Sequence, residues 1–281
     1  MGVPQAFNHF FDAIQALLNA DTGIFVHTGR QMAHWFSMLA LIYFGINAAQ
    51  KAELGGGFSF IALGKLLAYE AGVVGLVTYY QTPVVWLGGY SFTGLITGFM
   101  HQMALNIGMA QSDLLVARLA VIKSAIEVPT LLDGSLLYIL CYLLVWLVIT
   151  VLEIVTFLVI GWGFFGEAVC ILVGPLFIPF ALVPRLDGFF WNWLRCFVQY
   201  SAFQVVGAAA VYIVANTILP AYGNVGAITG AQLIADITGM LAMFGIGVVG
   251  ILGIPMLVSH MFSGSVGSNH GWLFAAASRL V

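Results

Sequence analysis

The stretch from Leu136 to Ile160 constrains the fold more than any other part of the chain. It holds 25 consecutive residues with a single charged side chain, Glu153. About 20 apolar residues in an α-helix cross the hydrocarbon core of a bilayer, whereas a transmembrane β-strand alternates apolar and polar residues. The stretch therefore predicts a transmembrane helix.

The composition of the whole chain agrees with this prediction. Of its 281 residues, 7% are charged and 62% are hydrophobic, and the mean hydropathy is +1.04. Average soluble domains carry about 25% charged residues, so this chain has too little polar surface for a soluble fold. We expect an all-α integral membrane protein with five or six transmembrane helices.

Changes in the apolar pattern divide the chain into five regions. They are an amphipathic interfacial helix over 1–20, a first transmembrane hairpin over 21–80, an extramembrane or interfacial helical loop over 81–133, a transmembrane core over 134–258 and a C-terminal tail over 259–281. Small and polar residues predict a break at 21–23 and a turn at 161–166. The turn would separate a span ending near residue 160 from one over about 168–183.

Two regions outside the predicted core have helical periodicity. Apolar residues recur every three or four positions over 3–18, which indicates a helix that lies at the membrane interface or packs on a partner subunit. In the 81–133 loop, one predicted helical face carries Leu115, Leu119, Ile122 and Ile126. On the opposite side, Lys123 and Glu127 have the spacing of an ion pair within a helix.

The distribution of Lys and Arg gives a first prediction of topology. With six spans, most of these residues fall on the side that holds the N-terminus, and only Lys51 falls on the other side. Cytoplasmic loops carry the excess of positive charge. The count therefore places both termini and the 81–133 loop in the cytoplasm.

No pattern indicates a catalytic, cofactor or metal site. The letters G-x-G-x-x-G occur at 245–250, but inside an apolar run rather than between a strand and a helix. Gly64-Lys65 lacks the other residues of a P-loop, and His27 and His34 have no evident third ligand. We expect a protein that is not an enzyme and has no cofactor.

The predicted spans contain ionisable side chains, and those considered for a pathway or for pairing between helices are Lys65, Glu70, Glu153 and Glu167. Asp236, at the start of the last span, is expected to cap that helix or pair with another helix. Such residues are unfavourable in lipid and usually face protein or water. Lys65 and Glu70 are separated by about 140° around a helix, so we expect them to pair with other helices. Across the predicted turn, Glu153 and Glu167 are expected to face each other or a hydrated crevice. A transport pathway and structural pairing both explain these residues.

The last predicted span has one face of small residues, namely Ala235, Gly239, Ala242, Gly250 and Gly253. Small residues let helices approach closely in lipid. The pattern predicts a helix-packing face.

The stretch VPRLDGFFWNWLRC, at 183–196, gathers charge and aromatic residues between two apolar runs. Arg185 and Asp187 are expected to form a polar turn at the membrane surface, with Gly188 permitting the reversal. An aromatic belt is expected at the head of the next span, formed by Phe189, Phe190, Trp191 and Trp193.

The sequence from Gly174 to Val206, GPLFIPFALVPRLDGFFWNWLRCFVQYSAFQVV, resembles the TrbL-type inner-membrane subunit of bacterial type IV secretion systems, the sixth component of the VirB set. The likeness extends over about 136–258. The residues at matching places are Gly174, Pro175, Leu176, Phe177, Arg185, Phe189, Phe190, Trp193 and Leu194. With Asp187 in the turn, they form the family hairpin.

The resemblance implies a multi-pass subunit of the bacterial inner membrane with no catalytic centre and no cofactor. It implies a translocation platform that forms a homo-oligomer and contacts pilin, a minor pilus-tip subunit and other inner-membrane subunits. Separate ATPases would supply energy, and DNA or protein would be passed outward. The family's central loop is placed in the periplasm, which conflicts with the charge count for 81–133.

Two other classes of function remain open. A secondary transporter or ion channel would use Glu70, Glu153 and Lys65 within the membrane. An intramembrane enzyme would need a catalytic set that the sequence does not display.

Overall fold

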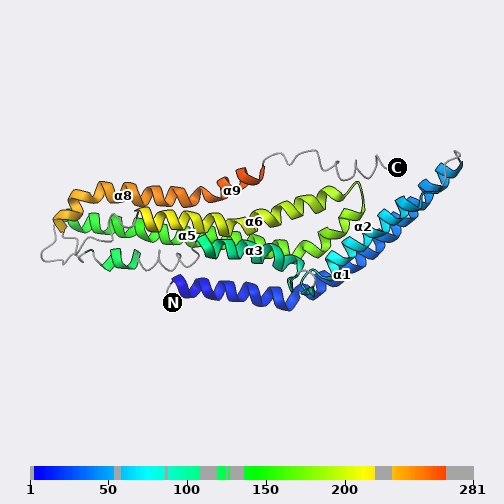
Figure 1. Ribbon diagram of the computed structural model, residues 1–281. Helices are drawn as coiled ribbons and strands as arrows, with labels where there is room; N and C mark the ends of the chain where they lie inside the picture. Colours follow the sequence, from blue (N-terminus) through cyan, green and yellow to red (C-terminus); the bar gives the residue numbers. More distant parts are fainter. Residues whose placement is uncertain are drawn as a thin grey trace. The chain divides into compact units, whose positions relative to one another are not determined.

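The computed structural model describes residues 3–53, 58–85, 88–107, 119–124, 126, 136–218 and 230–263. In this part of the chain almost every residue is helical, and five helices are long and apolar enough to cross a membrane (Figure 1). These helices are Gly23–Glu53, Phe60–Thr78, Leu136–Leu182, Asp187–Asn216 and Ala231–Phe262. The predicted all-α membrane fold is confirmed.

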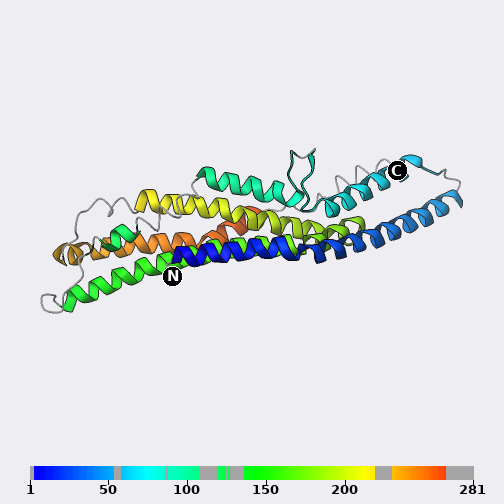
Figure 2. The same ribbon diagram turned by 90° about the horizontal axis from the view of Figure 1, so that it is seen from below.

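The first helix, α1 (Val3–Glu53), is longer than the sequence pattern predicts. The break expected at 21–23 is wrong, because α1 runs through these positions as one helix (blue in Figure 2). A single glycine within a helix costs only about 1 kcal/mol relative to alanine. One Gly beside an Asp and a Thr is therefore too weak a signal to end a helix with apolar turns on both sides.

The helix α5 (Leu136–Phe177) joins two spans that were expected to be separate. The turn predicted at 161–166 is wrong, because the helix is continuous there and ends only in the 3₁₀ helix η2 (Ile178–Leu182). A break inside an apolar run would expose backbone groups that lipid cannot hydrogen-bond. The glycines serve close packing instead: a Cβ at Gly163 would meet Phe203, and one at Gly166 would meet Tyr200.

The chain forms two compact units. Unit 1 comprises Met1–His9, Met100–Phe164 and Ser201–Ser259, and unit 2 comprises Phe10–Phe99, Phe165–Tyr200 and His260–Val281. Both α5 and α6 (Asp187–Ile213) contribute to each unit.

Unit 2 is built around an α1–α2 hairpin and the turn between α5 and α6. The helix α2 (Phe60–Thr78) starts at Ser59, whose hydroxyl accepts a hydrogen bond from the Ala62 amide at 3.3 Å. The end of α2 packs against η2 and the first turns of α6. This core contains Val73, Val77, Tyr80, Cys170, Ile171, Ile178, Ala181, Leu182, Phe190, Trp193 and Phe197. A short turn at 79–91, closed by a bridge between Val84 and Tyr90, leads into α3 (Phe92–Ile107).

Unit 1 contains the first part of α5, the second part of α6, α8 (Gly230–Leu252) and most of α9 (Ile254–Ser263). At the end of α6 the chain forms the π-helix η3 (Val214–Ile218), which contacts α8. The buried face of α8 carries Leu233, Met240, Phe244 and Ile251.

Within the 81–133 region, α3 and residues 119–124 are helical. The apolar face predicted there is buried at Leu119, Ile122 and Ile126, which are at most 2% exposed. Leu115 lies outside the described residues, as does Glu127. All three described members of this predicted face are thus buried.

Candidate functional site

The strongest local feature of the fold is a proline inside α5. Pro175 has no N–H, so it cannot donate the hydrogen bond that the carbonyl of Ile171 would receive in a regular helix. Two residues later the α-helix ends and η2 begins, with a second proline at Pro179. The sequence therefore leaves backbone acceptors free in an apolar environment, where an unpaired acceptor is unfavourable.

Two aromatic side chains bind the carbonyls beside this proline. The Tyr80 hydroxyl donates to the Ile171 oxygen at 2.9 Å, and the Trp193 indole N–H donates to the Cys170 oxygen at 2.9 Å. Tyr80 is 0% exposed and Trp193 is 5% exposed. Burial raises the pKa of Tyr80 well above its ordinary value, so the phenol keeps the proton that it donates. We call Tyr80 and Trp193, with these two carbonyls, the aromatic clamp.

The clamp requires a residue without a side chain at position 174. A Cβ on Gly174 would overlap the hydroxyl of Tyr80 and the ring of Trp193. The helix α1 approaches the same break just as closely, because a Cβ on Gly29 would overlap the carbonyl of Pro175. Two glycines and one proline thus allow three helical segments to meet at the break.

A layer of aromatic rings surrounds the clamp. Trp193 stacks on Phe197 with ring centroids 5.8 Å apart, and it lies 6.0 Å from Phe190 and 6.4 Å from Tyr80. The expected aromatic belt is therefore wrong for Trp193 and Phe190, which face the core of unit 2. Phe189, at 53% exposed, is the residue placed as a belt would have it.

The turn between η2 and α6 follows the clamp directly. The Val183 carbonyl accepts hydrogen bonds from the amides of Leu186, at 2.8 Å, and Asp187, at 3.0 Å. Asp187 starts α6, where a carboxylate is favoured by the helix dipole, and Arg185 is exposed. The reversal therefore occurs at 183–186, and the role predicted for Gly188 is wrong because that residue lies within α6.

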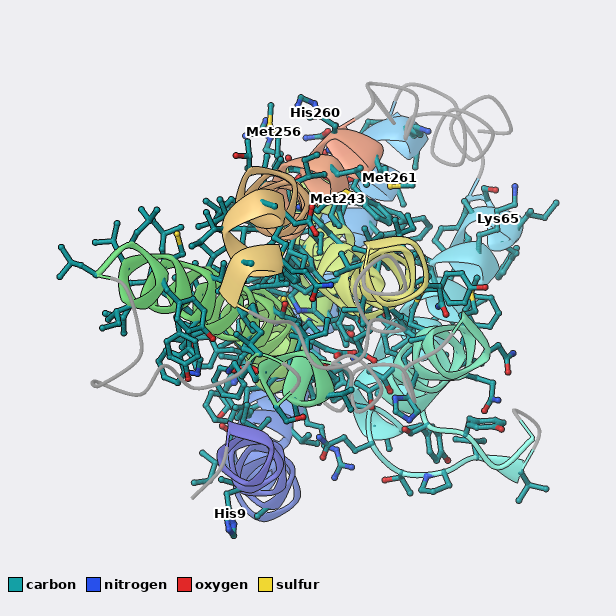
Figure 3. All side chains as sticks on the ribbon, turned by 90° about the vertical axis from the view of Figure 1, so that its left-hand side faces the viewer. His9, Lys65, Met243, Met256, His260 and Met261 are labelled. Atoms are coloured by element: carbon teal, nitrogen blue, oxygen red, sulfur yellow. The ribbon has the colours of Figure 1, made fainter. Side chains whose placement is uncertain are left out.

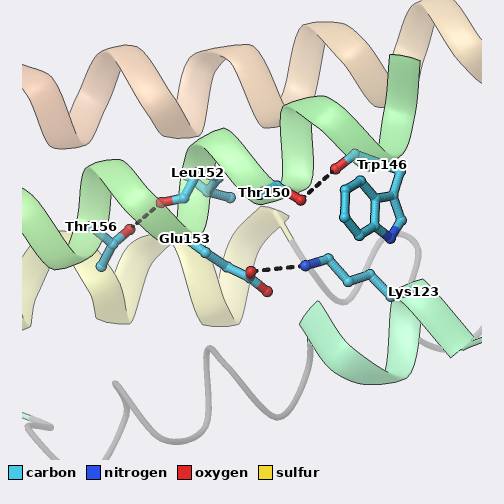
Figure 4. A network of polar contacts seen from close by, with 6 residues as sticks. All are labelled: Lys123, Trp146, Thr150, Leu152, Glu153 and Thr156. Atoms are coloured by element: carbon cyan, nitrogen blue, oxygen red, sulfur yellow. Dashed lines mark hydrogen bonds and ion pairs between the residues drawn. The ribbon is translucent and has the colours of Figure 1, made fainter. Parts of the chain in front are cut away.

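In unit 1, Glu153, one of the ionisable residues in the predicted spans, forms an ion pair with Lys123. The Lys123 ammonium lies 2.8 Å from the Glu153 carboxylate and 5.3 Å from the ring centroid of Trp146 (Figure 4). Both charged side chains are mostly buried, at 22% and 15% exposed. The sequence pattern pairs Lys123 with Glu127, whereas the structure pairs it with a residue 30 positions away.

The expectation that Glu153 and Glu167 face each other is wrong. They lie on the same helix, and their separation of fourteen positions corresponds to about 21 Å of helical rise. Glu167 is buried at 4% exposed. Their separation follows from the continuity of α5.

The other two predicted charges lie on α2 in different environments. Lys65 is exposed at the periphery of the molecule (Figure 3), whereas Glu70 is 6% exposed. The Oε1 atom of Glu70 has no hydrogen-bond partner among the described residues. The structure does not bring these two residues together, in agreement with their predicted angular separation.

The small-residue face of α8 is mostly exposed in the part of the chain that the structure describes. Gly239, Ala242 and Gly250 are exposed and Gly253 is half-buried, while the opposite face packs inside unit 1. A Cβ on Gly250 would meet no atom within 4 Å. Among the described residues, no helix packs closely against this face at Gly250.

Sequence reasoning missed Tyr80 and Gly29. The signal that could have revealed Tyr80 was Pro175. A proline within an apolar helix leaves the carbonyl four residues earlier without its helical donor, so a donor from another part of the chain is expected there. Among the described residues, no group of three His, Cys, Asp or Glu side chains is placed to hold a metal ion.

One comparison with known proteins, the family model, matches a region that contains the clamp. The family described as TrbL/VirB6 plasmid conjugal transfer protein matches the chain over residues 65–254. This range covers most of α2 and continues to the start of α9. No curated protein matches the chain.

Proposed function

The chain belongs to the TrbL/VirB6 plasmid conjugal transfer protein family, and from this we propose that it is the inner-membrane platform subunit of a type IV secretion system. The family is a structural component of conjugation and implies a multi-subunit transfer complex. The chain is a multi-pass membrane protein. As a platform it would support pilus assembly and pass DNA or protein across the envelope.

One observation carries the structural part of this proposal: the aromatic clamp fixes the α5–α6 hairpin inside the matched region. A platform must hold its helices in one arrangement while substrates pass. Two buried hydrogen bonds from rigid aromatic side chains, next to a proline break, favour a single hairpin geometry. We assign Gly174, Pro175 and Trp193 to this role, with Arg185 and Asp187 positioning the turn.

We further propose that the chain forms a homo-oligomer and contacts pilin, a minor pilus-tip subunit and other inner-membrane subunits. The open small-residue face of α8, with Gly239, Ala242, Gly250 and Gly253, supports such contacts because small residues allow close helix approach in lipid. Separate ATPases would supply energy, and contact with DNA or protein substrates would be transient.

The test is transfer of DNA or protein from a host that lacks the gene for this chain. We expect the deletion to abolish transfer and wild type to restore it. Trp193→Ala should reach the membrane and fail, because it removes both the indole donor and the centre of the aromatic layer. Trp193→Phe, which retains a ring, should transfer partially. Trp35→Ala is the control, since Trp35 is 64% exposed on α1.

Two results would overturn separate parts of the proposal. Transfer that is unaffected by the deletion would remove the platform function itself. Full transfer by Trp193→Ala at wild-type membrane levels would retain the platform function but show that the clamp has no part in it.

One observation bears on the alternative of a transporter or channel. Glu153 is held in an ion pair with Lys123, which favours structural pairing over a pathway role for this residue. Solute or proton flux in proteoliposomes that depends on Glu153 would contradict this assignment.

A further inference from the structure

Glu70 is a buried residue whose carboxylate oxygen Oε1 has no hydrogen-bond partner among the described residues. It lies in α2 on the face that also carries Val73 and Val77 and packs against η2. Its side chain is enclosed in unit 2, and no described residue donates a hydrogen bond to Oε1. A carboxylate that is removed from water without a compensating charge or donor is strongly unfavourable, above all inside a membrane.

The elements around Glu70 supply no counter-ion at its level. On α2 the other charged residue is Lys65, which is exposed and about 140° around the helix. On α1 the nearby residues that can carry a positive charge are His34, which is exposed, and Arg30, whose guanidinium donates to the Thr78 carbonyl at 3.2 Å near the end of α2. The sequence of η2, IPFAL, contains no charged residue. Among the described residues, no cationic side chain forms an ion pair with Glu70.

The register of the α1–α2 hairpin shows what lies opposite. The rings of Phe44 and Phe58 are 6.1 Å apart at one end, and Arg30 binds the Thr78 carbonyl at the other. Counting inward along both helices from these two contacts places residues 32–38 of α1 opposite position 70 of α2.

This part of α1 contains a second buried oxygen without a partner. The hydroxyl of Ser37 is buried and has no hydrogen-bond partner among the described residues. Its neighbour Phe36 packs on Phe180 of η2 with ring centroids 5.6 Å apart, so this turn of α1 faces the same element as Glu70. Two unpaired oxygens, one anionic and one neutral, thus occur at one level of the hairpin.

We propose that the α1–α2 hairpin binds a small monovalent cation, Na⁺ or a proton, at Glu70 and Ser37. A carboxylate and a hydroxyl are oxygen ligands of the kind that hard cations prefer. The site lies apart from the clamp and is independent of the proposed platform role.

The experiment tests cation binding to the purified full-length protein in detergent. The thermal unfolding midpoint is recorded as NaCl replaces choline chloride at constant ionic strength. A ligand that binds only the folded state raises this midpoint. If the cation is Na⁺, the midpoint rises with NaCl in wild type, the rise is lost in Glu70→Gln, and Ser37→Ala needs a higher Na⁺ concentration for the same rise.

Infrared spectroscopy of the same samples distinguishes a proton from Na⁺. If a proton is bound, the midpoint does not depend on Na⁺, and the carbonyl stretch of a protonated carboxylic acid is present in wild type and absent in Glu70→Gln. Glu53→Gln, at the exposed end of α1, is the matched control and should behave as wild type in both measurements. A wild-type protein with neither a Na⁺ response nor a protonated-acid band would overturn the proposal.

Discussion

Replacing Tyr80 with phenylalanine tests the logic of the clamp most directly. The change keeps the ring that packs in the core of unit 2 and removes only the hydroxyl that binds the Ile171 carbonyl at 2.9 Å. Because Pro175 cannot supply a replacement donor, the carbonyl is left unpaired in a buried site. Such a loss costs about 1–3 kcal/mol in proteins, while hydrogen bonds between membrane helices average about 0.6 kcal/mol. We expect Tyr80→Phe to lower the free energy of unfolding by about 1–2 kcal/mol.

The assay is reversible unfolding by sodium dodecyl sulfate in mixed micelles, with Tyr79→Phe as the control. Tyr79 precedes Tyr80 directly and is 46% exposed. The difference between wild type and Tyr80→Phe should stay constant up to about pH 10, the ordinary pKa of tyrosine. Burial raises the folded-state pKa of Tyr80, so its contribution is complete below that pH and declines as the pH rises further.

A double-mutant cycle with Pro175→Ala separates the clamp from general packing. Alanine restores an N–H at position 175 that can donate to the Ile171 carbonyl within α5. Tyr80→Phe should then cost less than in wild type, with a coupling free energy of about 1 kcal/mol. Equal costs in both backgrounds, or equal effects of Tyr80→Phe and Tyr79→Phe, would refute the explanation given for this hydrogen bond.

Two further substitutions test the packing at the break and the ion pair of unit 1. Gly174→Ala should lower the free energy of unfolding by about 3 kcal/mol or more, because its Cβ overlaps two rigid rings and overpacking alone costs about 1–3 kcal/mol. Gly188→Ala is the control: its Cβ meets no atom within 4 Å, so it should not destabilise the protein in the same unfolding assay. Lys123→Met should cost about 1–3 kcal/mol by leaving Glu153 unpaired, less than the 3–5 kcal/mol of a fully buried pair. Adding Glu153→Gln should recover most of that loss, and a double variant no more stable than Lys123→Met would show the pair to be incidental.

The spans could be predicted from the sequence because lipid demands long apolar helices, and the run from Leu136 to Ile160 has no other stable form. The positions at which the helices end could not be predicted in this way. Glycines at 161–166 resemble a turn when read locally, but their role depends on Phe203 and Tyr200, which approach from a helix far along the chain. Packing against residues far along the chain therefore determines that these glycines form a close helix contact and not a turn.

The candidate site shows the same division. The family hairpin pointed to Gly174, Pro175 and Trp193, but interface physics assigned Trp193 to the membrane surface, whereas the structure buries it and uses its N–H. The role of Tyr80 could not be predicted from the sequence, because no residue near it in the sequence has an unpaired carbonyl. Its partner is created by Pro175, 95 residues later, so only the packing of α2 against α5 and η2 reveals the role.

The length of α5 gives a physical reason for assembly. Its 42 residues extend about 63 Å, whereas the hydrocarbon core is about 30 Å thick. To fit within that thickness the helix would need a tilt of about 60°, beyond the 0–40° range of transmembrane helices. Large apolar side chains are nevertheless exposed along its whole length, from Leu136 at 85% through Leu147 at 59% to Trp162 at 58% and Val169 at 41%. A bilayer of that thickness covers about half of this surface, and the remainder is apolar surface that is exposed among the described residues. This exposed surface supports the proposal that the chain works within an oligomeric platform.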